Sequence, residues 1–160
     1  MAELEQRLSF MKMAVELAIE NVRSGDGGPF GALIVKDGQL ISSGTNAVAA
    51  ENDPTAHAEI VAIRRACQLL ETFQLTGCEV YCSCEPCPMC LGALYWARPD
   101  AVYFAGTHED AASAGFDDGY IYREFELAPE ERKLKVIRIP TETSAEPFDL
   151  WLARADRVEY

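Results

Sequence analysis

The sequence has no long apolar run and no secretory signal at its start. An uncharged apolar stretch such as residues 91–97 is much shorter than the roughly 20 residues that a membrane-spanning helix needs. The opening residues, MAELE, carry neither the positive segment nor the apolar core of a signal peptide. We therefore expect a cytoplasmic protein that does not cross a membrane.

Positive charge is scarce as well. Lysine and arginine together number 14 against 26 aspartates and glutamates, which gives a formal net charge of −12. Nucleic-acid binding depends largely on neutralising phosphates with Lys and Arg, and the densest basic spots here are short, at Arg64, Arg65 and residues 132–135. The charge therefore disfavours a nucleic-acid partner and favours a small neutral or cationic substrate.

The length and the apolar patterns indicate one layered domain. With 160 residues, of which 49% are hydrophobic, we expect a single domain over residues 1–160. Periodicity and turn signals predict a helix ending near Gly25, a hairpin turning at Asp37 and Gly38, and a helix beginning near Thr55. Strands are expected at 32–35, 40–42, 79–82, 101–104 and 134–139, and further helices at 88–97, 107–125 and 147–157. Strands that alternate with helices are typical of an α/β sheet.

One histidine belongs to a recognisable metal motif. His57 stands two residues before Glu59, and Cys87 and Cys90 follow in the segment PCPMC. Three protein ligands of this kind leave the fourth tetrahedral position of zinc open for water. Bound zinc lowers the pKa of that water toward neutrality, and a nearby carboxylate that is not a ligand can take up its proton. The pattern therefore predicts a catalytic zinc site and is the signature of zinc-dependent nucleobase deaminases.

A Cys-x-x-Cys pair alone has other interpretations. The chain holds two overlapping pairs, Cys84 with Cys87 and Cys87 with Cys90. A redox dithiol would use one pair at a helix N-terminus, but it would not require the histidine and the glutamate. A structural zinc site built from Cys82 and these three cysteines would crowd four ligands into one segment, unlike the separated pairs of most structural sites. We favour the catalytic site.

The remaining histidine and cysteines receive structural interpretations. His108 is expected to be a solvated residue at a helix start rather than a fourth ligand. Cys67 falls on an apolar helix face, and Cys78 and Cys82 flank a predicted strand, so we expect buried small hydrophobes there. Without an export signal we expect reduced cysteines. Iron can occupy similar ligands, so the motif alone does not identify the metal.

Several segments beyond the metal motif resemble one protein family. They are GGPFGA at 27–32, NDPTAHAE at 52–59, SCEPCPMCLGA at 83–93, YWARP at 95–99 and AGFDD at 114–118. The chain is similar to members of the cytidine deaminase-like superfamily, and most closely to the bacterial guanine deaminases. The resemblance implies a three-layer α/β/α fold around a mixed five-stranded sheet. It also implies zinc-dependent hydrolysis of guanine to xanthine and ammonia in purine breakdown.

The resemblance implies roles for individual residues. Glu59 would accept the proton of the water and return it to the ring nitrogen. Asp117 would assist at the departing amino group, although a helix-cap or turn role fits it equally. An Asn amide can both donate to and accept from a purine edge, and aromatic side chains can form apolar walls, although a turn and a core would also accommodate such residues. The residues implied in substrate binding are Phe30, Asn46, Ala58, Trp96 and Tyr160.

The C-terminal tyrosine is a further point of similarity. The resembling enzymes are homodimers that exchange their C-terminal segments, so that a terminal tyrosine covers the active site of the partner subunit. We therefore expect the segment from about Phe148 to Tyr160 to be exchanged between two copies. A frayed, solvated tail is the alternative. A movable cover would exclude water from the reaction and admit the base when open.

Other functions remain open at this point. A tRNA adenosine deaminase shares the zinc motif and the fold, although the net charge of −12 and the bulky Trp96 argue against it. Deamination of cytosine, a triazine or another free heterocycle would use the same chemistry in a different pocket. A non-catalytic zinc-binding interaction module would bind metal without turnover, and the intact Glu59 argues against it.

Overall fold

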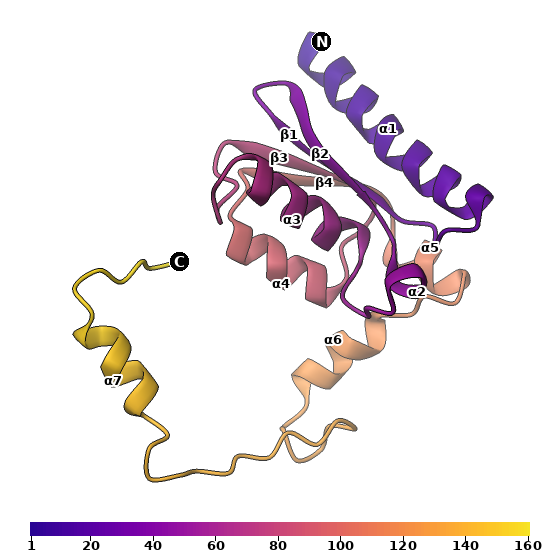
Figure 1. Ribbon diagram of the computed structural model, residues 1–160. Coiled ribbons are helices and arrows are strands. Elements are labelled where there is room, and N and C mark those ends of the chain that lie inside the picture. The colour runs from indigo at the N-terminus through magenta and orange to yellow at the C-terminus, as the bar shows by residue number, and fades with distance from the viewer. The chain divides into compact units, whose positions relative to one another are not determined.

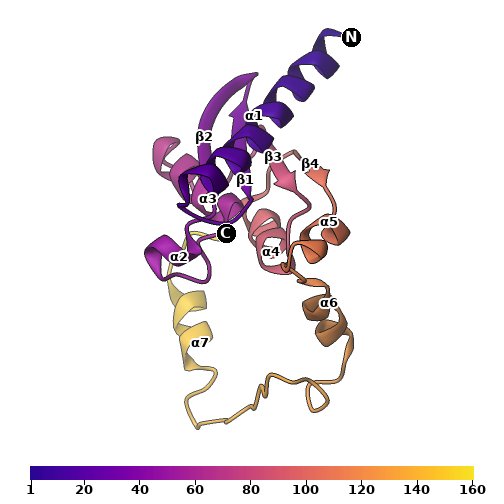
Figure 2. The same ribbon diagram turned by 90° about the vertical axis from the view of Figure 1, so that its right-hand side faces the viewer.

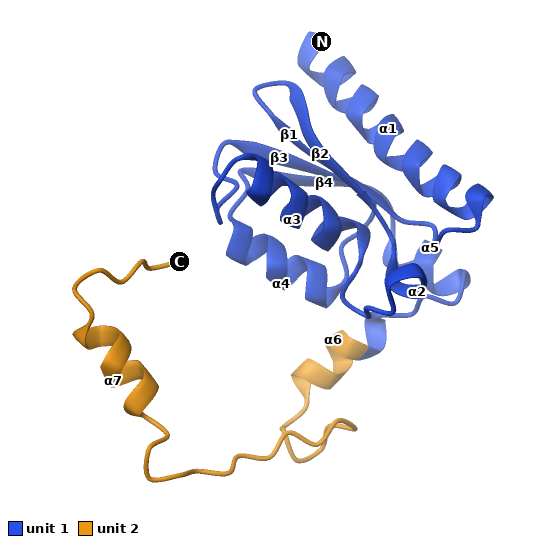
Figure 3. Cartoon of the chain, viewed as in Figure 1, with its two compact units in different colours: residues 1–120 blue, residues 121–160 orange.

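The computed structural model describes all 160 residues of the chain (Figure 1). It divides into two compact units, residues 1–120 (unit 1) and residues 121–160 (unit 2), which Figure 3 shows in different colours. Unit 1 contains the sheet and the helices that pack on it. Helix α6 (Gly119–Glu126) spans the boundary, and unit 2 contains helix α7 (Glu146–Ala153) between irregular segments.

The sheet begins with the predicted hairpin. Strands β1 (Gly31–Lys36) and β2 (Gln39–Thr45) pair antiparallel and are joined by Asp37 and Gly38. The φ angles of these two residues are 50° and 70°. Positive φ at both central residues is the type I′ geometry that matches the twist of paired strands. The hairpin predicted at this dipeptide is therefore confirmed.

Strands β3 (Cys78–Cys84) and β4 (Ala101–Gly106) complete the sheet where strands are predicted. β3 pairs antiparallel with β1, and β4 pairs parallel with β3, so the strand order is β2-β1-β3-β4. A parallel pair needs a crossover connection, and helix α4 (Pro88–Ala97) provides it. The sheet is mixed, as predicted.

Helices cover both faces of the sheet and give three layers (Figures 1 and 2). Helix α1 (Ala2–Ser24) packs on the face that carries Leu33 and Val35. Helix α3 (Ala58–Leu69) and α4 pack on the opposite face, which carries Ala32 and Ile34. Successive strand residues point to opposite faces, so a strand covered on both sides has an uninterrupted apolar sequence, as β1 does. The predicted α/β/α layering is confirmed.

The approach of α3 to β2 depends on a glycine. A Cβ atom at Gly44 would collide with the carbonyl oxygen of Ala58, the first residue of α3. Ser42, also in β2, donates a hydrogen bond of 2.8 Å to the carbonyl oxygen of Ala62. The N-terminal part of α3 is therefore held against the sheet, and this fixes the position of His57 directly before it.

The prediction of a fifth strand is wrong. Residues 134–139 have no regular secondary structure, and the sheet has four strands. Apolar residues with high strand propensity form a strand only when a neighbouring strand accepts and donates their backbone hydrogen bonds. Residues 134–139 have no such neighbour within this chain.

The region predicted as one helix at 107–125 is two helices. Helix α5 (His108–Ser113) starts at a capping box formed by Thr107 and Asp110. Gly115 follows it with a φ of 93°, a left-handed conformation that ends a helix, and α6 starts only at Gly119. The last helix, α7, also ends before the predicted residue 157.

The helix predicted to begin near Thr55 begins at Ala58. The Asp53 carboxylate accepts hydrogen bonds from both the backbone N–H and the hydroxyl of Thr55, at 2.8 and 2.7 Å, and these hold the residues in a turn. A short helix α2 (Val48–Glu51) precedes this turn, and the apolar pattern gives no sign of it. None of the helices has both the length and the apolar character required to cross a membrane.

Candidate active site

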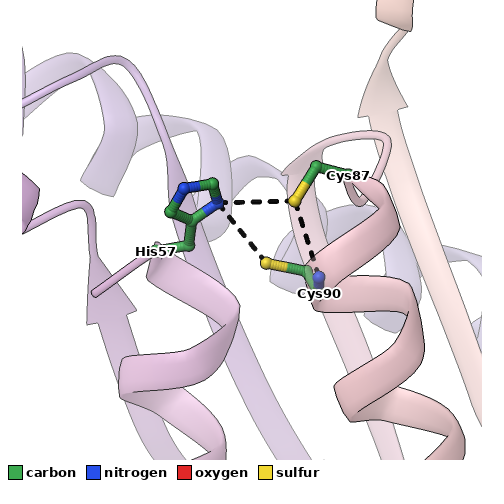
Figure 4. Close-up of side chains that lie close together, drawn as sticks. All are labelled: His57, Cys87 and Cys90. Atoms are coloured by element: carbon green, nitrogen blue, oxygen red, sulfur yellow. Dashed lines mark hydrogen bonds between the residues drawn. The ribbon is translucent and has the colours of Figure 1, made fainter. Parts of the chain in front are cut away.

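The three predicted metal ligands lie at the N-termini of two helices (Figure 4). His57 is the N-cap of α3, Cys87 is the N-cap of α4, and Cys90 lies in the first turn of α4. Pro88 favours the start of α4, because the N–H that proline lacks would have no intrahelical partner there. The partial positive charge at a helix N-terminus favours thiolates, so the local fold stabilises the ionised ligands.

The ligand atoms have the spacing of a tetrahedral zinc site. Nδ1 of His57 is 3.5 Å from Sγ of Cys87 and 3.5 Å from Sγ of Cys90. All three atoms lie within 4.8 Å of one another. With Zn–N of about 2.0–2.1 Å and Zn–S of about 2.3 Å, tetrahedral angles separate nitrogen and sulfur ligands by roughly 3.6 Å. The two nitrogen–sulfur separations are close to this value, so the residues fit a zinc ion.

The two thiols have opposite pKa shifts because one donates a hydrogen bond to the other. A hydrogen bond from Cys90, with a further one from His57, lowers the pKa of Cys87 to about 4. The pKa of Cys90 is raised above its usual range, because it donates to Cys87 and is buried. The hydrogen bond to Cys87 raises the pKa of His57. Two thiolates this close can both be ionised only when a positive charge compensates them, as Zn²⁺ does.

Glu59 lies next to this cluster as a buried carboxyl group. It is the second residue of α3, and 7% of the residue is exposed. Burial raises its pKa. A carboxyl group with a raised pKa can accept a proton in one step and release it in another near neutral pH. Glu59 is not one of the clustered ligand residues, so its carboxyl group would stay free to exchange protons. This is consistent with the predicted role as acid and base.

Phe30 and Asn46 lie side by side at one end of the β1–β2 pair. The backbone N–H of Asn46 donates to the carbonyl oxygen of Phe30 at 3.1 Å. The next residue, Ala47, donates to the carbonyl oxygen of Ala56 at 2.9 Å, which ties this loop to the residue before His57. Both predicted recognition residues are half-buried and belong to the end of the sheet from which the metal ligands are presented.

The other predicted recognition residues differ in exposure. Ala58 is buried and follows His57 directly in the chain. Trp96 lies on α4 and is 64% exposed. Tyr160 belongs to unit 2 and is 70% exposed. The fold of unit 1 therefore brings Ala58 beside the ligands, whereas both aromatic residues present most of their surface to solvent.

Two adjacent aspartates precede α6 and differ in their contacts. Oδ1 of Asp117 accepts a hydrogen bond of 3.0 Å from the backbone N–H of Gly119, which is the turn alternative for this residue. Asp118 is half-buried, and its Oδ1 lies 3.2 Å from Nδ1 of His108. Burial raises the pKa of Asp118, the neighbouring His108 opposes this rise, and the negative charge of Cys87 adds to it. The sequence pattern does not distinguish the surroundings of Asp118 from those of Asp117.

The expectation that His108 is solvated is wrong. The side chain is 24% exposed, and its Nε2 lies 3.4 Å from Oε1 of Glu85. The cause is the parallel pairing of β3 with β4: the residue after β3, Glu85, donates its backbone N–H to the carbonyl oxygen of Gly106 at 2.9 Å. The segment after β3, with Glu85, and the segment after β4, with His108, are therefore adjacent. The sequence alone does not predict this contact, because it depends on how the two strands pair.

The cysteines outside the ligand set have other surroundings. Cys82 is fully buried in the core between the sheet and α3 and α4. Sγ of Cys84 lies 3.4 Å from the carbonyl oxygen of Thr107. The four-cysteine alternative is therefore not assembled. Cys78 is buried as predicted, Cys67 is half-buried, and all six cysteines are free.

Comparison with known proteins identifies the family. Residues 4–106 match the cytidine and deoxycytidylate deaminase zinc-binding region. Guanine deaminase from Bacillus subtilis is 54% identical over 152 residues, which cover 95% of this chain and 97% of that protein. The X-ray structure of the B. subtilis enzyme matches with a TM-score of 0.93 over the same shares of the two chains.

More distant relatives match a shorter part of the chain. The tRNA-specific adenosine deaminase from Aquifex aeolicus is 46% identical over 96 residues, or 60% of this chain and 63% of that protein. A solved structure of a guanine deaminase from Nitrosomonas europaea matches this chain with a TM-score of 0.65 and a sequence identity of 37%. The match covers 69% of this chain and 64% of that protein. With its zinc ligands His57, Cys87 and Cys90, the chain belongs to the cytidine and deoxycytidylate deaminase family.

Proposed function

We propose that this protein is a guanine deaminase, which hydrolyses guanine to xanthine and ammonia in purine breakdown. The observation that carries the proposal is the 54% identity to B. subtilis guanine deaminase over 95% of this chain and 97% of that protein. The clustered ligands and the buried Glu59 support a hydrolytic deamination. In this reaction a C–O bond forms and a C–N bond breaks at the ring carbon that carries the exocyclic amino group.

Glu59 would move the proton that the reaction requires. Zinc held by His57, Cys87 and Cys90 would supply a water whose pKa is lowered toward neutrality. The Glu59 carboxylate would accept the proton of that water and deliver it to the ring nitrogen next to the attacked carbon. Burial raises the pKa of Glu59, so the carboxyl group can hold the proton between the two steps.

The departing amino group needs a donor, for which we retain Asp117 and add Asp118. Burial raises the pKa of Asp118, which favours the protonated form that a donor requires. Asp117 instead accepts the exposed hydrogen bond from Gly119. These contacts favour Asp118. A large loss of turnover in Asp118→Asn with near-normal turnover in Asp117→Asn would support it, and the reverse pattern would return the role to Asp117.

Base recognition would use residues at the end of the sheet. The Asn46 side chain can donate to and accept from a purine edge, and its neighbour Phe30 would form an apolar wall. The ring of Phe30 packs edge to face against Phe116, with ring centroids 5.0 Å apart, so its orientation is restrained. Ala58 would contribute backbone groups near the attacked carbon, and Trp96 would form a further wall.

The C-terminal segment would complete the site in a homodimer. The proposed segment from about Phe148 to Tyr160 exposes apolar side chains: Phe148 is 71% exposed, Leu152 64% and Tyr160 70%. Soluble proteins rarely leave large contiguous apolar surfaces uncovered. We propose that a second copy covers this segment by exchange and that Tyr160 contacts the bound base in the partner. One complete deaminase domain would then comprise the equivalent of residues 1–160.

Deamination of adenosine in tRNA is the second candidate. The A. aeolicus relative that carries this name is 46% identical, but over 60% of this chain. The net charge of −12 also opposes binding of a phosphate backbone. Both observations favour guanine over tRNA.

The test is a comparison of substrates with protein of measured zinc content. We would follow ammonia release and the ultraviolet change with guanine, adenine, cytosine and an adenosine-containing RNA stem-loop. Turnover of guanine alone is expected. Turnover of the RNA without guanine would replace the proposal with the second candidate. Inactivity on all four with zinc bound would instead indicate another heterocycle, such as a triazine, or a non-catalytic zinc module.

A further inference from the structure

His108 lies between two carboxylates that come from distant parts of unit 1. Its Nε2 is 3.4 Å from Oε1 of Glu85, and its Nδ1 is 3.2 Å from Oδ1 of Asp118. The side chains of the three residues are 24%, 34% and 20% exposed, in the order His108, Glu85, Asp118. The contact with Asp118 is at ion-pair distance but lacks the alignment of a hydrogen bond. Through its two contacts the imidazole connects the segment that carries the metal-binding cysteines to the segment before α6.

The backbone around His108 is well fixed. Thr107 donates its backbone N–H to the Asp110 carboxylate at 2.8 Å, and the Thr107 hydroxyl accepts from the backbone N–H of Asp110 at 3.3 Å. The backbone N–H of His108 itself donates to Oε2 of Glu85 at 3.4 Å. The first two contacts fix the first turn of α5, and the third joins this turn to Glu85, the residue after β3. The backbone that carries the His108 side chain is therefore fixed in position.

Asp118, in contrast, belongs to an irregular segment. Residues 114–118 form no helix or strand, and Gly115 within them has a φ of 93°. The direction of the Asp118 side chain therefore depends on side-chain contacts more than on regular structure. Phe116, two residues before Asp118, packs against Phe30 with ring centroids 5.0 Å apart, and His108 contacts Glu85, two residues before Cys87. These contacts place the segment that carries Asp118 beside the metal-binding segment.

We propose that His108 is a positioning residue whose Nδ1 holds the Asp118 carboxyl group at the active site, where Asp118 assists departure of the amino group. This inference rests on the proposed function. Glu85 engages the opposite ring nitrogen and restrains rotation of the imidazole. Without the imidazole, Asp118 would move with its segment, and the chemical step would slow although the metal ligands remain in place.

Two amide substitutions distinguish the role of Nδ1 of His108 from that of Nε2. The amide N–H of His108→Asn can occupy the position of Nδ1 next to Asp118, and that of His108→Gln the position of Nε2 next to Glu85. We expect His108→Ala and His108→Gln to lower kcat for guanine by about 10- to 100-fold with KM and zinc content nearly unchanged. His108→Asn should restore kcat to within about threefold of the wild type if one well-placed N–H suffices.

The outcomes separate this inference from the proposed function. A zinc-loaded wild type that does not turn over guanine refutes the function. Normal turnover by both the wild type and His108→Ala refutes the positioning role alone. Equal losses in all three variants, or rescue by Gln and not by Asn, also overturn the role. Loss of zinc from His108→Ala would assign the histidine to support of the metal-binding segment and overturn it as well.

A second measurement does not depend on activity. The chain has two histidines, His57 and His108, so the ring nitrogens of His108 can be distinguished by ¹⁵N NMR of the zinc-loaded protein. We expect Asp118→Asn to shift the His108 resonances and Asp117→Asn to leave them in place. Unchanged His108 resonances in Asp118→Asn would overturn the contact on which the proposal depends.

Discussion

Units 1 and 2 contain similar apolar residues but differ in how these residues are covered. Leu33, Ile34 and Val80 of unit 1 are fully buried between the sheet and the helices. In unit 2, Ile137 is 77% exposed and Ile139 83%, and α7 buries no residue. An apolar pattern becomes a packed element only where another element covers it. Unit 1 contains its own covering layers, and unit 2 needs a surface from elsewhere.

Polar contacts show the same contrast. In unit 1, Arg7 reaches Glu79 at 3.1 Å across 72 positions of sequence and so ties α1 to β3. In unit 2, the ion pair between Arg154 and Asp156 at 3.0 Å joins residues two positions apart. A contact between distant positions fixes the tertiary arrangement, whereas a contact between near neighbours does not. Unit 1 is therefore the part whose fold the chain specifies by itself.

The largest expected effect comes from truncating one isoleucine in each unit. Ile34→Ala should lower the free energy of unfolding by about 2 to 5 kcal/mol, because it leaves a cavity in a fully buried site. Ile137→Ala should change it by less than about 0.5 kcal/mol in dilute protein, because its side chain is exposed. Denaturant unfolding at low protein concentration measures both. Equal losses would remove the distinction between the units.

Removal of the last three residues tests what unit 2 contributes to the site. Deletion of residues 158–160 should lower kcat/KM for guanine by about 10-fold or more, because the cover that positions the base and excludes water is incomplete. The zinc content and the unfolding midpoint should stay unchanged. An unchanged rate would show that the tail takes no part in the site.

Mixing two impaired variants tests whether the tail acts between copies. Glu59→Gln retains the tail but lacks the carboxyl group that acts as acid and base. The deletion variant retains Glu59 but lacks the tail. In a dimer with exchanged tails, the mixed dimer contains one site with an intact Glu59 and an intact tail, so activity should rise above the residual activity of the two variants measured separately. No recovery after subunit exchange would contradict a tail supplied by the partner.

A smaller effect is expected from the long-range ion pair. The hydroxyl of Tyr81 donates to Glu79 at 2.7 Å, and this bond together with Arg7 lowers the pKa of Glu79. A lowered pKa in the folded state stabilises the protein above the unfolded pKa, near 4.5, and this stabilisation is lost as the pH falls through the folded value.

Glu79→Gln should therefore destabilise at pH 7 by about 1 kcal/mol, a modest amount since the carboxylate is partly exposed. The difference from the wild type should shrink as the pH drops below 4.5. Asp156→Asn in unit 2 is the matched control, for which we expect no measurable change in unfolding at either pH. A difference for Glu79→Gln that grows toward low pH would reverse the assigned sign.

The parts of the fold that were predictable from the sequence depend on short-range signals. Pro88 predicts the start of α4, and the Asp37-Gly38 dipeptide predicts the hairpin, because local backbone preferences decide both. The metal ligands were equally predictable from the sequence, since His-x-Glu and Cys-x-x-Cys place suitable donors at helix starts. Their clustering within 4.8 Å is consistent with that prediction.

The predictions that failed depend on tertiary neighbours. Residues 134–139 have strand propensity, but they have no strand to pair with in this chain. His108 is half-buried because the pairing of β3 with β4 brings Glu85 next to it. The different contacts of Asp117 and Asp118 follow from side-chain directions in an irregular segment, which no periodic pattern encodes.

The central claim is that unit 1 carries out hydrolytic deamination with a metal bound by His57, Cys87 and Cys90 and with Glu59 as the proton carrier. The most direct test measures zinc content and guanine turnover of the wild type and of Glu59→Gln on the same samples. The account predicts equal zinc in both and a turnover in Glu59→Gln that is lower by about 10² to 10⁴-fold or more. Near-normal turnover in a zinc-loaded Glu59→Gln would contradict it.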